Sequence, residues 1–480
     1  MGSWSEEHEW KLVFIVAFVA RALMFLLTPV DWNSDSYHHW QISYYTLKIG
    51  LNEGRMWDLT GSEYYWGMIP HLINSFLLWL FRTSSIEVYR AFNVVMGAVN
   101  SVLVYHVAKR YYSVENARWS GLAFAIFPVS VIFDSVAMQD TVALTLVLSS
   151  LLVMRDRYFL SGLLLGLACH SRVEYTMISL LILSGFLLRE RLFTDSQPYL
   201  FGWLAGWGAP SLHIYSQTGN PIYPLYWSLY SVFGGYTSSY KGMPFTYTMY
   251  RWLSSRTYIW TGSPSGLLII LIGASGLLLI PWMAKRKWKR YQPQLYLAST
   301  LTVMTPLVMP YFDSRRTYLL LMMRFFIPIA ALGFPLLFHL IARLKRDNRN
   351  RGVTLKVRLG VIACLLLGFM LVPEYLALQG VVESEFDLAD SAASRYEGGR
   401  IVCDRPSLVY RFVHLHGVEP ENILSNQYSP HYYGIDDPRK YLDWVVDQDI
   451  RIWTYVGDWV PQFERYWKST IPSSSVSLMA

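Results

Sequence analysis

The stretch LVFIVAFVARALMFLLTPV, Leu12–Val30, is apolar over nearly its whole length, and DWNSDSYHHW, Asp31–Trp40, follows it directly. A helix of about 20 apolar residues is long enough to cross the hydrocarbon core of a bilayer. The second stretch therefore places two carboxylates and two imidazoles at a membrane boundary, where an unpaired charge is costly. Because ionisable groups in such surroundings are usually functional, this stretch is the first candidate for a site.

The composition of the whole chain indicates a membrane protein. Of 480 residues, 53% are hydrophobic and 16% are charged, whereas soluble domains carry about 25% charged residues. The 19 Trp and 34 Tyr suit the belts that aromatic rings form at membrane interfaces. The net charge of +7 does not indicate nucleic-acid binding, because the basic residues cluster in short loops between apolar segments. The three cysteines are widely spaced and predict neither a disulfide framework nor a zinc site.

Eleven apolar segments are expected to span the membrane as helices. A twelfth, Tyr64–Phe81, contains Pro70 and His71 and is expected to lie on the outer surface as a helix instead. The expected spans are Leu12–Val30, Val88–Ala108, Trp119–Phe133, Thr141–Met154, Tyr158–His170, Tyr175–Leu188, Tyr199–Tyr215, Ser265–Met283, Leu295–Tyr311, Thr317–Ile341 and Val357–Val372.

Two basic clusters, Lys285–Arg290 and Arg343–Arg358, set the expected orientation of these spans. Short basic loops stay on the cytoplasmic side of a membrane. Counting spans from the two clusters places the N-terminus in the cytoplasm and the C-terminal part outside. The expected location is thus the cell membrane, as a multi-pass protein, or the endoplasmic reticulum membrane in a eukaryote.

The expected fold is an all-α polytopic membrane domain of about 11 transmembrane helices, residues 1–382, followed by a small extracytoplasmic α/β domain, residues 383–480. Outer loops are expected at residues 31–87 and 218–264. The last hundred or so residues are richer in charge and contain short apolar runs typical of strands. Strands are expected at Arg400–Cys403 and Ile450–Tyr455, and helices at Ser407–His416 and Pro438–Asp447.

Four acidic side chains, Asp31, Asp35, Asp134 and Asp140, are expected on the outer face. Asp35 is the first candidate for a general base, because it precedes an aromatic and histidine run at the membrane boundary. The alternative is that Asp31 or Asp35 caps the helix that follows. Asp140 opens an apolar helix, so it is a candidate for an active-site acid and equally for an ordinary helix cap.

The same region offers ligands for a divalent cation such as Mg²⁺ or Mn²⁺. Asp140, Asp31 and His38 are the supporting candidates. Two carboxylates from different loops do not make a metal site by themselves, and histidines at an interface are often only solvated. The sequence therefore leaves metal dependence open.

Arg324 is the candidate for binding an anion. It lies in Leu319–Ile329, a stretch with no other charge, where a guanidinium needs a phosphate or a carboxylate as partner. Arg315 and Arg316 lie near the outer boundary and are expected to share in binding the donor phosphate. The alternative for Arg324 is an ion pair with a buried carboxylate such as that of Glu174.

Three further arginines are expected to have structural roles. Arg172 precedes Glu174 by two residues and is expected to pair with it, while Arg21 and Arg90 are expected to serve packing or pairing within the spans. The chain contains no phosphate-binding glycine loop, no HExxH and no GxSxG motif. The anion is therefore expected to arrive in the membrane, as a lipid phosphate.

The order of these features resembles the GT-C superfamily of integral-membrane glycosyltransferases that use polyprenyl-phosphate sugars. Asp35-Ser-Tyr-His38-His39 stands where that superfamily has its catalytic acid, and Arg324-Phe-Phe-Ile-Pro328 is similar to its late arginine segment. Phe127-Pro128 through Asp140-Thr141 resembles the segment that ends in the second acidic position. Further similarities are Ile69-Pro70-His71, Tyr89-Arg90-Ala91-Phe92, His170-Ser-Arg172-Val-Glu174 and Gly219-Asn220-Pro221-Ile-Tyr-Pro224.

Two departures limit what the resemblance implies about the acceptor. The Trp-Trp-Asp segment of oligosaccharyltransferase catalytic subunits is absent, which argues against transfer of a whole oligosaccharide to asparagine. Asp35 is followed by Ser, whereas protein O-mannosyltransferases and lipid A aminoarabinose transferases have Glu there. Neither of those acceptors can therefore be carried over.

The resemblance implies an inverting transfer of a sugar from a polyprenyl-phosphate donor to an acceptor on the outer face. Asp35 would act as the base, and Arg324, with Arg315 or Arg316, would stabilise the departing phosphate. The implied partners are the lipid-linked sugar, a glycan, lipid or protein acceptor, and membrane lipid, with no nucleic acid. The alternatives are a transporter or flippase for a lipid-linked or anionic solute, and a scaffold whose outer tail binds partners.

Overall fold

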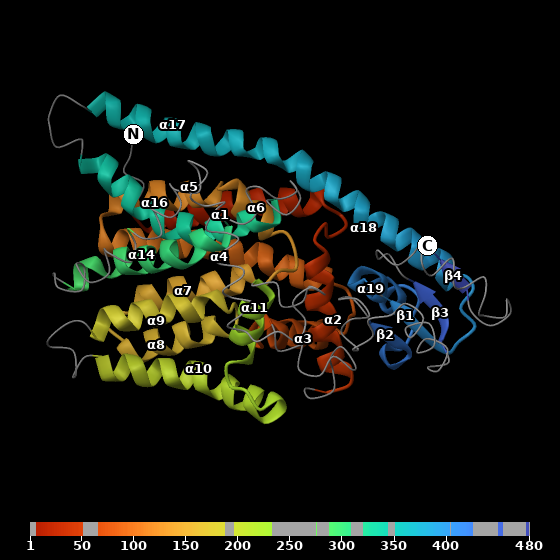
Figure 1. The fold of residues 1–480 in the computed structure, drawn as a ribbon. Helices are drawn as coiled ribbons and strands as arrows, with labels where there is room; N and C mark the ends of the chain where they lie inside the picture. Colours follow the sequence, from red (N-terminus) through yellow and green to blue (C-terminus); the bar gives the residue numbers. More distant parts are fainter. Residues whose placement is uncertain are drawn as a thin grey trace, which may run out of the picture.

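The computed structural model describes residues 6–50, 66–187, 196–232, 275, 288–308, 320–343, 351–403, 405–425, 450–454 and 477–479. Within these residues the protein is mostly helical, as expected, with a small sheet near the C-terminus. Most of the helices lie side by side in a bundle, while α2 and α3 lie at one end of it, between the bundle and the sheet (Figure 1).

The first half of the chain forms most of the bundle and the two helices at its end. These helices are α1 (Glu6–Leu27), α2 (Ser34–Lys48), α3 (Ile69–Phe81), α4 (Glu87–Tyr111), α5 (Val114–Ala125), α6 (Pro128–Phe133), α7 (Asp140–Val153), α8 (Tyr158–Cys169), α9 (Glu174–Leu187), α10 (Ser196–Thr218) and α11 (Tyr223–Val232).

The second half adds helices to the bundle and then forms the sheet. Its helices are α14 (Trp288–Val308), η3 (Met323–Phe325), α16 (Phe326–Arg343), α17 (Arg351–Leu367), η5 (Gly368–Leu371), α18 (Val372–Ala393), α19 (Pro406–His414) and η6 (Pro420–Asn422). Its strands are β1 (Arg400–Cys403), β2 (Ile423–Ser425), β3 (Ile450–Thr454) and β4 (Ser477–Met479).

Several of these helices are apolar enough to cross a membrane. Among the described residues, His8–Leu27, Glu87–Tyr111, Leu320–Arg343 and Lys356–Ala393 also have the length to do so, and several other apolar helices are shorter. The number and orientation of the spans stay predictions. The expected span at Ser265–Met283 lies, apart from residue 275, outside the described residues.

One predicted span is interrupted. The sequence predicts a single helix over Trp119–Phe133, whereas α5 ends at Ala125 and α6 begins at Pro128. Proline lacks an N–H and disfavours helical backbone in the residue before it, and Phe127 is extended, with φ −69° and ψ 111°. The break leaves the carbonyl oxygen of Ala125 free to accept a hydrogen bond from Nη1 of Arg21, at 3.0 Å.

Helices α8 and α10 pack backbone against backbone through glycines. A Cβ atom on Gly162 would overlap the carbonyl oxygen of Tyr199, and one on Gly202 would overlap that of Phe159. Small residues at helix interfaces permit this close approach, which replaces the missing hydrophobic driving force between helices in lipid. The contact explains how the short helix α8 is held in the bundle.

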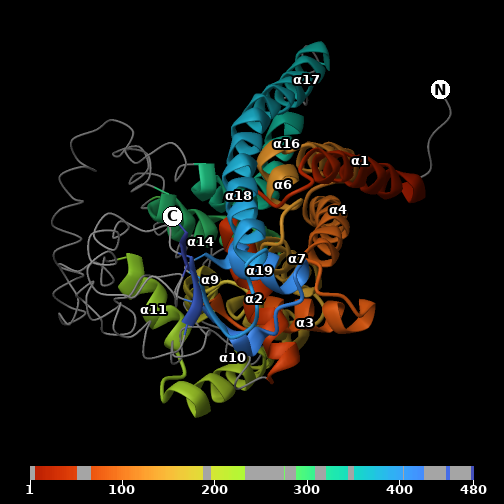
Figure 2. The ribbon, with the colours of Figure 1, turned by 90° about the vertical axis from the view of Figure 1, so that its right-hand side faces the viewer.

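Helices α17 and α18 are joined by η5 into one long rod, which runs along the bundle and on to the sheet (Figures 1 and 2). Only 6% of its most apolar 18-residue stretch, within Lys356–Ala393, is buried inside the protein. Such a surface suits contact with lipid. Helix α18 continues across residue 383, where the two domains are predicted to meet, and that division stays a prediction.

The sheet is parallel, in the order β2-β1-β3-β4. Strand β1 has the bounds predicted for it, and β3 ends one residue before the predicted end. Helix α19 packs against α2: the ring of Tyr410 lies 5.2 Å from that of Tyr37 and 4.8 Å from that of Trp40. The predicted helix Pro438–Asp447 lies outside the described residues.

Candidate active site

Helix α2 follows the apolar helix α1 and carries Asp35 in its first turn. Its N-cap is Asn33, whose side-chain oxygen accepts a hydrogen bond from the backbone N–H of Asp35 at 3.1 Å. The alternative in which Asp31 or Asp35 caps the helix is therefore wrong, because the amide oxygen of Asn33 fills that place. The Asp35 carboxylate is left for another role, at a helix start whose partial positive charge favours anions.

Arg324 lies opposite Asp35, on the short turn η3 that leads into α16. Its Nη1 is 3.6 Å from Oδ2 of Asp35, which is within ion-pair range but too long for a hydrogen bond. Arg324 is only 5% exposed, and among the described residues its Nε and Nη1 have no hydrogen-bond acceptor. A buried guanidinium with open N–H donors is suited to bind an anion.

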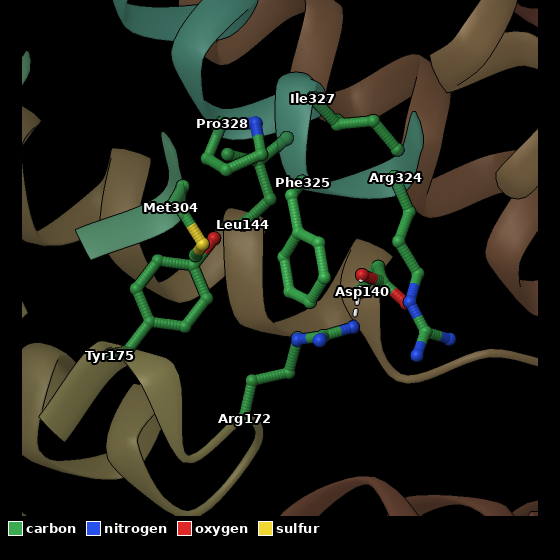
Figure 3. Close-up of a pocket in the computed structure, with 9 residues that line it drawn as sticks. All are labelled: Asp140, Leu144, Arg172, Tyr175, Met304, Arg324, Phe325, Ile327 and Pro328. Carbon is green, nitrogen blue, oxygen red and sulfur yellow. Dashed lines mark hydrogen bonds and ion pairs between the residues drawn. The ribbon is translucent and has the colours of Figure 1, made fainter. Parts of the chain in front are cut away.

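Arg324 and Arg172 both line a small pocket, together with the carboxylate of Asp140 (Figure 3). The ring of Phe325 lies 5.1 Å from Cζ of Arg172 and 5.8 Å from Cζ of Arg324. Cationic groups therefore share this pocket with apolar walls, a combination that suits the phosphate of a lipid. The other residues that line it are Leu144, Tyr175, Met304, Ile327 and Pro328.

Arg172 is held by two acids. Its Nη1 forms an ion pair with Oδ1 of Asp140, and its Nε donates a hydrogen bond to Oε2 of Glu174 at 3.1 Å. The expected pair of Arg172 with Glu174 is thus present. Arg324 also has a carboxylate as ion-pair partner, but this is the partly exposed Asp35 and not the buried Glu174. Oδ2 of Asp140 is buried and has no hydrogen-bond partner among the described residues.

Asp140 reaches the pocket because α7 starts there. The N-cap of α7 is Gln139, whose side chain makes no capping hydrogen bond, so Asp140 itself lies inside the first turn. The sequence leaves Asp140 open between helix cap and active-site acid, and the structure places it beside Arg172 in the pocket. Burial raises the cost of its charge, and the guanidinium of Arg172 offsets that cost.

Asp31 is placed in the framework beside the site. It is fully buried, and its Oδ2 accepts a hydrogen bond from the N–H of Ala137 at 2.8 Å and lies 3.9 Å from Nε of Arg90. Burial raises the pKa of Asp31, against the opposing effect of Arg90 and of the backbone hydrogen bonds. Asp31 therefore fixes the start of α2 to the connection between α6 and α7, and it does not line the pocket.

Asp134, at the C-terminal end of α6, has a similar structural role. Its carboxylate accepts hydrogen bonds from Nε of Arg21 at 2.8 Å and from the hydroxyl of Thr141 at 2.6 Å. Arg21 also bonds to Ser130, so its donors are well used. The pairing roles expected for Arg21 and Arg90 are confirmed, and together these pairs hold the segment that presents Asp140.

Three buried histidines lie on α2 and α3: His38, His39 and His71. Nδ1 of His39 is 3.0 Å from Nε2 of His71, and Nδ1 of His71 is 2.6 Å from the carbonyl oxygen of Gly67. Burial lowers the pKa of His38 to about 3 and that of His71 to about 4, and it lowers the pKa of His39 well below its usual value. All three are therefore neutral near pH 7.

Two parts of the expected site lie beyond what the structure describes. Arg315 and Arg316 fall outside the described residues, and so does most of the outer loop 218–264. Two bonds in the site were not predicted from the sequence: that between Arg172 and Asp140 and that between His39 and His71. No local signal predicts either pair, because each is separated by 32 residues and brought together only by helix packing.

Comparison with known proteins supports the predicted resemblance. Residues 68–209 match the family model described as dolichyl-phosphate-mannose-protein mannosyltransferase. No curated protein matches the chain.

Solved structures align with this chain at TM-scores below 0.5. The apo oligosaccharyltransferase of Archaeoglobus fulgidus is 11% identical, with a TM-score of 0.49 over 94% of this chain and 70% of that one. ArnT from Cupriavidus metallidurans, bound to undecaprenyl phosphate, is 13% identical, with a TM-score of 0.49 over 94% of this chain and 97% of that one. The family match confirms the resemblance predicted from the sequence over residues 68–209.

Proposed function

We propose that this protein is an inverting glycosyltransferase that moves a sugar from a polyprenyl-phosphate donor to an acceptor on the outer face of the membrane. The observation that carries the proposal is the meeting of Asp35 with Arg324, whose buried N–H donors lack acceptors among the described residues. One group suits a base and the other a phosphate, and Arg324 also lines the pocket that it shares with Arg172 and Asp140. A lipid-linked sugar phosphate fits both.

The reaction follows from this geometry. The carboxylate of Asp35 takes the proton from an acceptor hydroxyl as that oxygen attacks the anomeric carbon of the sugar. The bond from the anomeric carbon to the phosphate oxygen breaks on the opposite side, and its electron pair leaves with the polyprenyl phosphate. Arg324 stabilises the additional negative charge on that phosphate. Attack opposite the leaving group inverts the anomeric configuration.

The ion pair between Asp35 and Arg324 prepares both groups for this reaction. At 3.6 Å the contact is electrostatic and forms no hydrogen bond, so an incoming phosphate can take the guanidinium donors without breaking one. Asp35 is about one-third exposed, which leaves its carboxylate open to an acceptor. Arg172 adds positive charge nearby, although Asp140 and Glu174 balance it.

A divalent cation remains part of the proposal only as an option to be tested. Asp140 and Asp31 are oxygen ligands of the right kind, but among the described residues no group of three or more His, Cys, Asp or Glu side chains is arranged to hold a metal ion. No step of the reaction is therefore assigned to a metal. Activity that is lost with EDTA and restored by Mg²⁺ or Mn²⁺ would add one.

The experiment is to measure polyprenyl phosphate released by the purified protein from a panel of polyprenyl-phosphate sugars, with cell-envelope extract as acceptor source. The mannosyl donor comes first, because of the description of the matching family. Asp35→Ala and Arg324→Ala are expected to abolish release. The matched controls are Asp390→Asn and Arg411→Ala, which break another Asp–Arg pair, 2.7 Å apart, between α18 and α19.

The controls separate loss of chemistry from loss of folding, since they remove the same residue types away from the pocket. Release that depends on the sugar, persists in the controls and is lost in both site variants supports the proposal. No release from any donor would favour the transporter or flippase alternative instead.

The outer-face location is tested separately. Ser34 is exposed at the start of α2, so a Ser34→Cys variant without the native cysteines can report on which side the site lies. A membrane-impermeant maleimide added to intact cells is expected to label it. Labelling only after the cells are opened would place the site in the cytoplasm and contradict this part of the proposal.

A further inference from the structure

The hydrogen bonds of His71 and His39 determine which nitrogens carry their protons. Nδ1 of His71 is 2.6 Å from the carbonyl oxygen of Gly67, and because a carbonyl oxygen only accepts, that nitrogen must donate. A neutral His71 then has a bare Nε2, which lies 3.0 Å from Nδ1 of His39. Nδ1 of His39 must therefore be the donor in this second bond.

This leaves Nε2 of His39 as a bare acceptor. The atom is buried, and it has no hydrogen-bond partner among the described residues. His39 as a whole is 2% exposed. A buried polar atom without a partner costs free energy, and a bound group that donates a hydrogen bond would remove that cost.

The position of His39 ties this acceptor to the proposed reaction. Asp35 and His39 are four residues apart on α2, so they lie on one face of the helix, about 6 Å apart along its axis. The positive charges of Arg324 and Arg172 reach His39 and contribute to lowering its pKa. His39 thus lies on the side of α2 where the donor phosphate is proposed to bind.

We infer that Nε2 of His39 accepts a hydrogen bond from a ring hydroxyl of the donor sugar and so selects the sugar that is transferred. The inference rests on the proposed function and assigns to that site a neutral, hydroxyl-bearing sugar. The sugar lies between the base Asp35 and the phosphate held by Arg324, within reach of the next turn of α2. His71 is a positioning residue, because its bond to Gly67 fixes which nitrogen of His39 is bare.

Two other roles for His39 fit the surroundings less well. A general base must bind a proton near pH 7, and the burial of His39 among cationic groups opposes this. A cationic amino sugar is disfavoured by the same two arginines. A neutral hydroxyl can donate to Nε2 without protonating His39 and without adding positive charge beside the two arginines.

The test compares the wild-type protein with His39→Leu on the parent lipid-linked sugar and on analogues that each lack one ring hydroxyl. In the wild type, loss of the hydroxyl that His39 binds is expected to lower kcat/KM about 10-fold, the size of one hydrogen bond. In His39→Leu, kcat/KM for the parent sugar is expected to fall by a similar factor. The analogue that lacks the bound hydroxyl is then expected to have the same kcat/KM as the parent sugar. The other analogues keep the wild-type ratio to the parent.

Further variants separate a selective role from a structural one. His39→Gln places an acceptor oxygen near the position of Nε2 and is expected to restore the preference for the same hydroxyl. His71→Leu frees the tautomer of His39 and is expected to weaken that preference. Ser43→Ala is the matched control, because the Ser43 hydroxyl is buried one turn further along α2 and, within the described part of the chain, donates its hydrogen bond to the backbone oxygen of His39.

The outcomes are distinguishable. If His39→Leu lowers the rate equally for the parent and every analogue, the role is structural and the inference is overturned while the proposed function stands. If His39→Leu does not fold, the same decision is made from His39→Gln and from the wild-type series. If the wild-type protein transfers no sugar from any donor, the proposed function fails, and the inference falls with it.

Discussion

Replacement of Arg324 by alanine is expected to lower kcat/KM for sugar transfer about 100- to 10,000-fold without lowering thermal stability. Two donor nitrogens, Nε and Nη1, lack hydrogen-bond partners among the described residues, so the phosphate is expected to gain two charge-assisted hydrogen bonds. Each contributes about 1.5–3 kcal/mol, and about 1.4 kcal/mol corresponds to a factor of ten. The stability is expected to hold, because the variant removes a buried charge that is weakly paired.

The assay follows release of polyprenyl phosphate and the melting temperature in the same detergent preparation. Arg324→Lys serves as the intermediate variant, since it keeps the charge as a single point and loses the planar fork. Its rate of polyprenyl phosphate release is expected to lie between those of the wild type and Arg324→Ala. A loss of activity below threefold in Arg324→Ala, or a fall in activity that only follows a lower melting temperature, would refute the phosphate-binding role.

Two further predictions concern stability. Because unfolded histidine titrates near pH 6.5 and the folded pKa values of His38 and His71 are about 3 and about 4, the unfolded state binds more protons between these values. The melting temperature is therefore expected to fall as the pH decreases from 6.5 towards 4, and a flat profile would contradict the neutral, buried state. Gly202→Ala is expected to separate α8 from α10 and lower the melting temperature by several degrees. Gly208→Ala is the matched control, since its Cβ meets no atom within 4 Å, and equal melting temperatures for the two variants would refute the packing role.

The sequence predicts the site where chemistry alone makes a residue conspicuous. A carboxylate at a membrane boundary and an arginine in an apolar stretch are costly, which identified Asp35 and Arg324 before any contact between them was known. The positions of the basic loops predict that both lie on the same side of the membrane. The structure adds that the two meet at 3.6 Å.

Other features depend on tertiary packing and leave no local trace. Asn33 caps α2, while its neighbour Asp31 accepts a hydrogen bond from the N–H of Ala137 and pairs with Arg90. The interruption of the span at Pro128 could have been read from the proline, but the use of the freed carbonyl by Arg21 could not. Hydrogen bonds and ion pairs between helices therefore determine parts of the site that the sequence does not predict.

The four aspartates near the predicted outer boundary also cannot be told apart from the sequence alone. Asp31, Asp35, Asp134 and Asp140 look alike in the sequence, as acids near an outer boundary. In the structure, Asp31 and Asp134 are buried in bonds to the framework, while Asp140 lines the pocket and Asp35 faces Arg324. Only the partners, which lie far along the chain, separate a structural carboxylate from a candidate for catalysis.

The most direct test of the account compares the purified wild-type protein with Asp35→Asn, which has nearly the same shape but cannot take a proton. The quantity measured is the rate of polyprenyl phosphate release from the donor that the wild type uses best, with acceptor present. The account predicts a loss of about 100- to 10,000-fold, the usual contribution of a general base, at an unchanged donor affinity. Full activity in Asp35→Asn would contradict it.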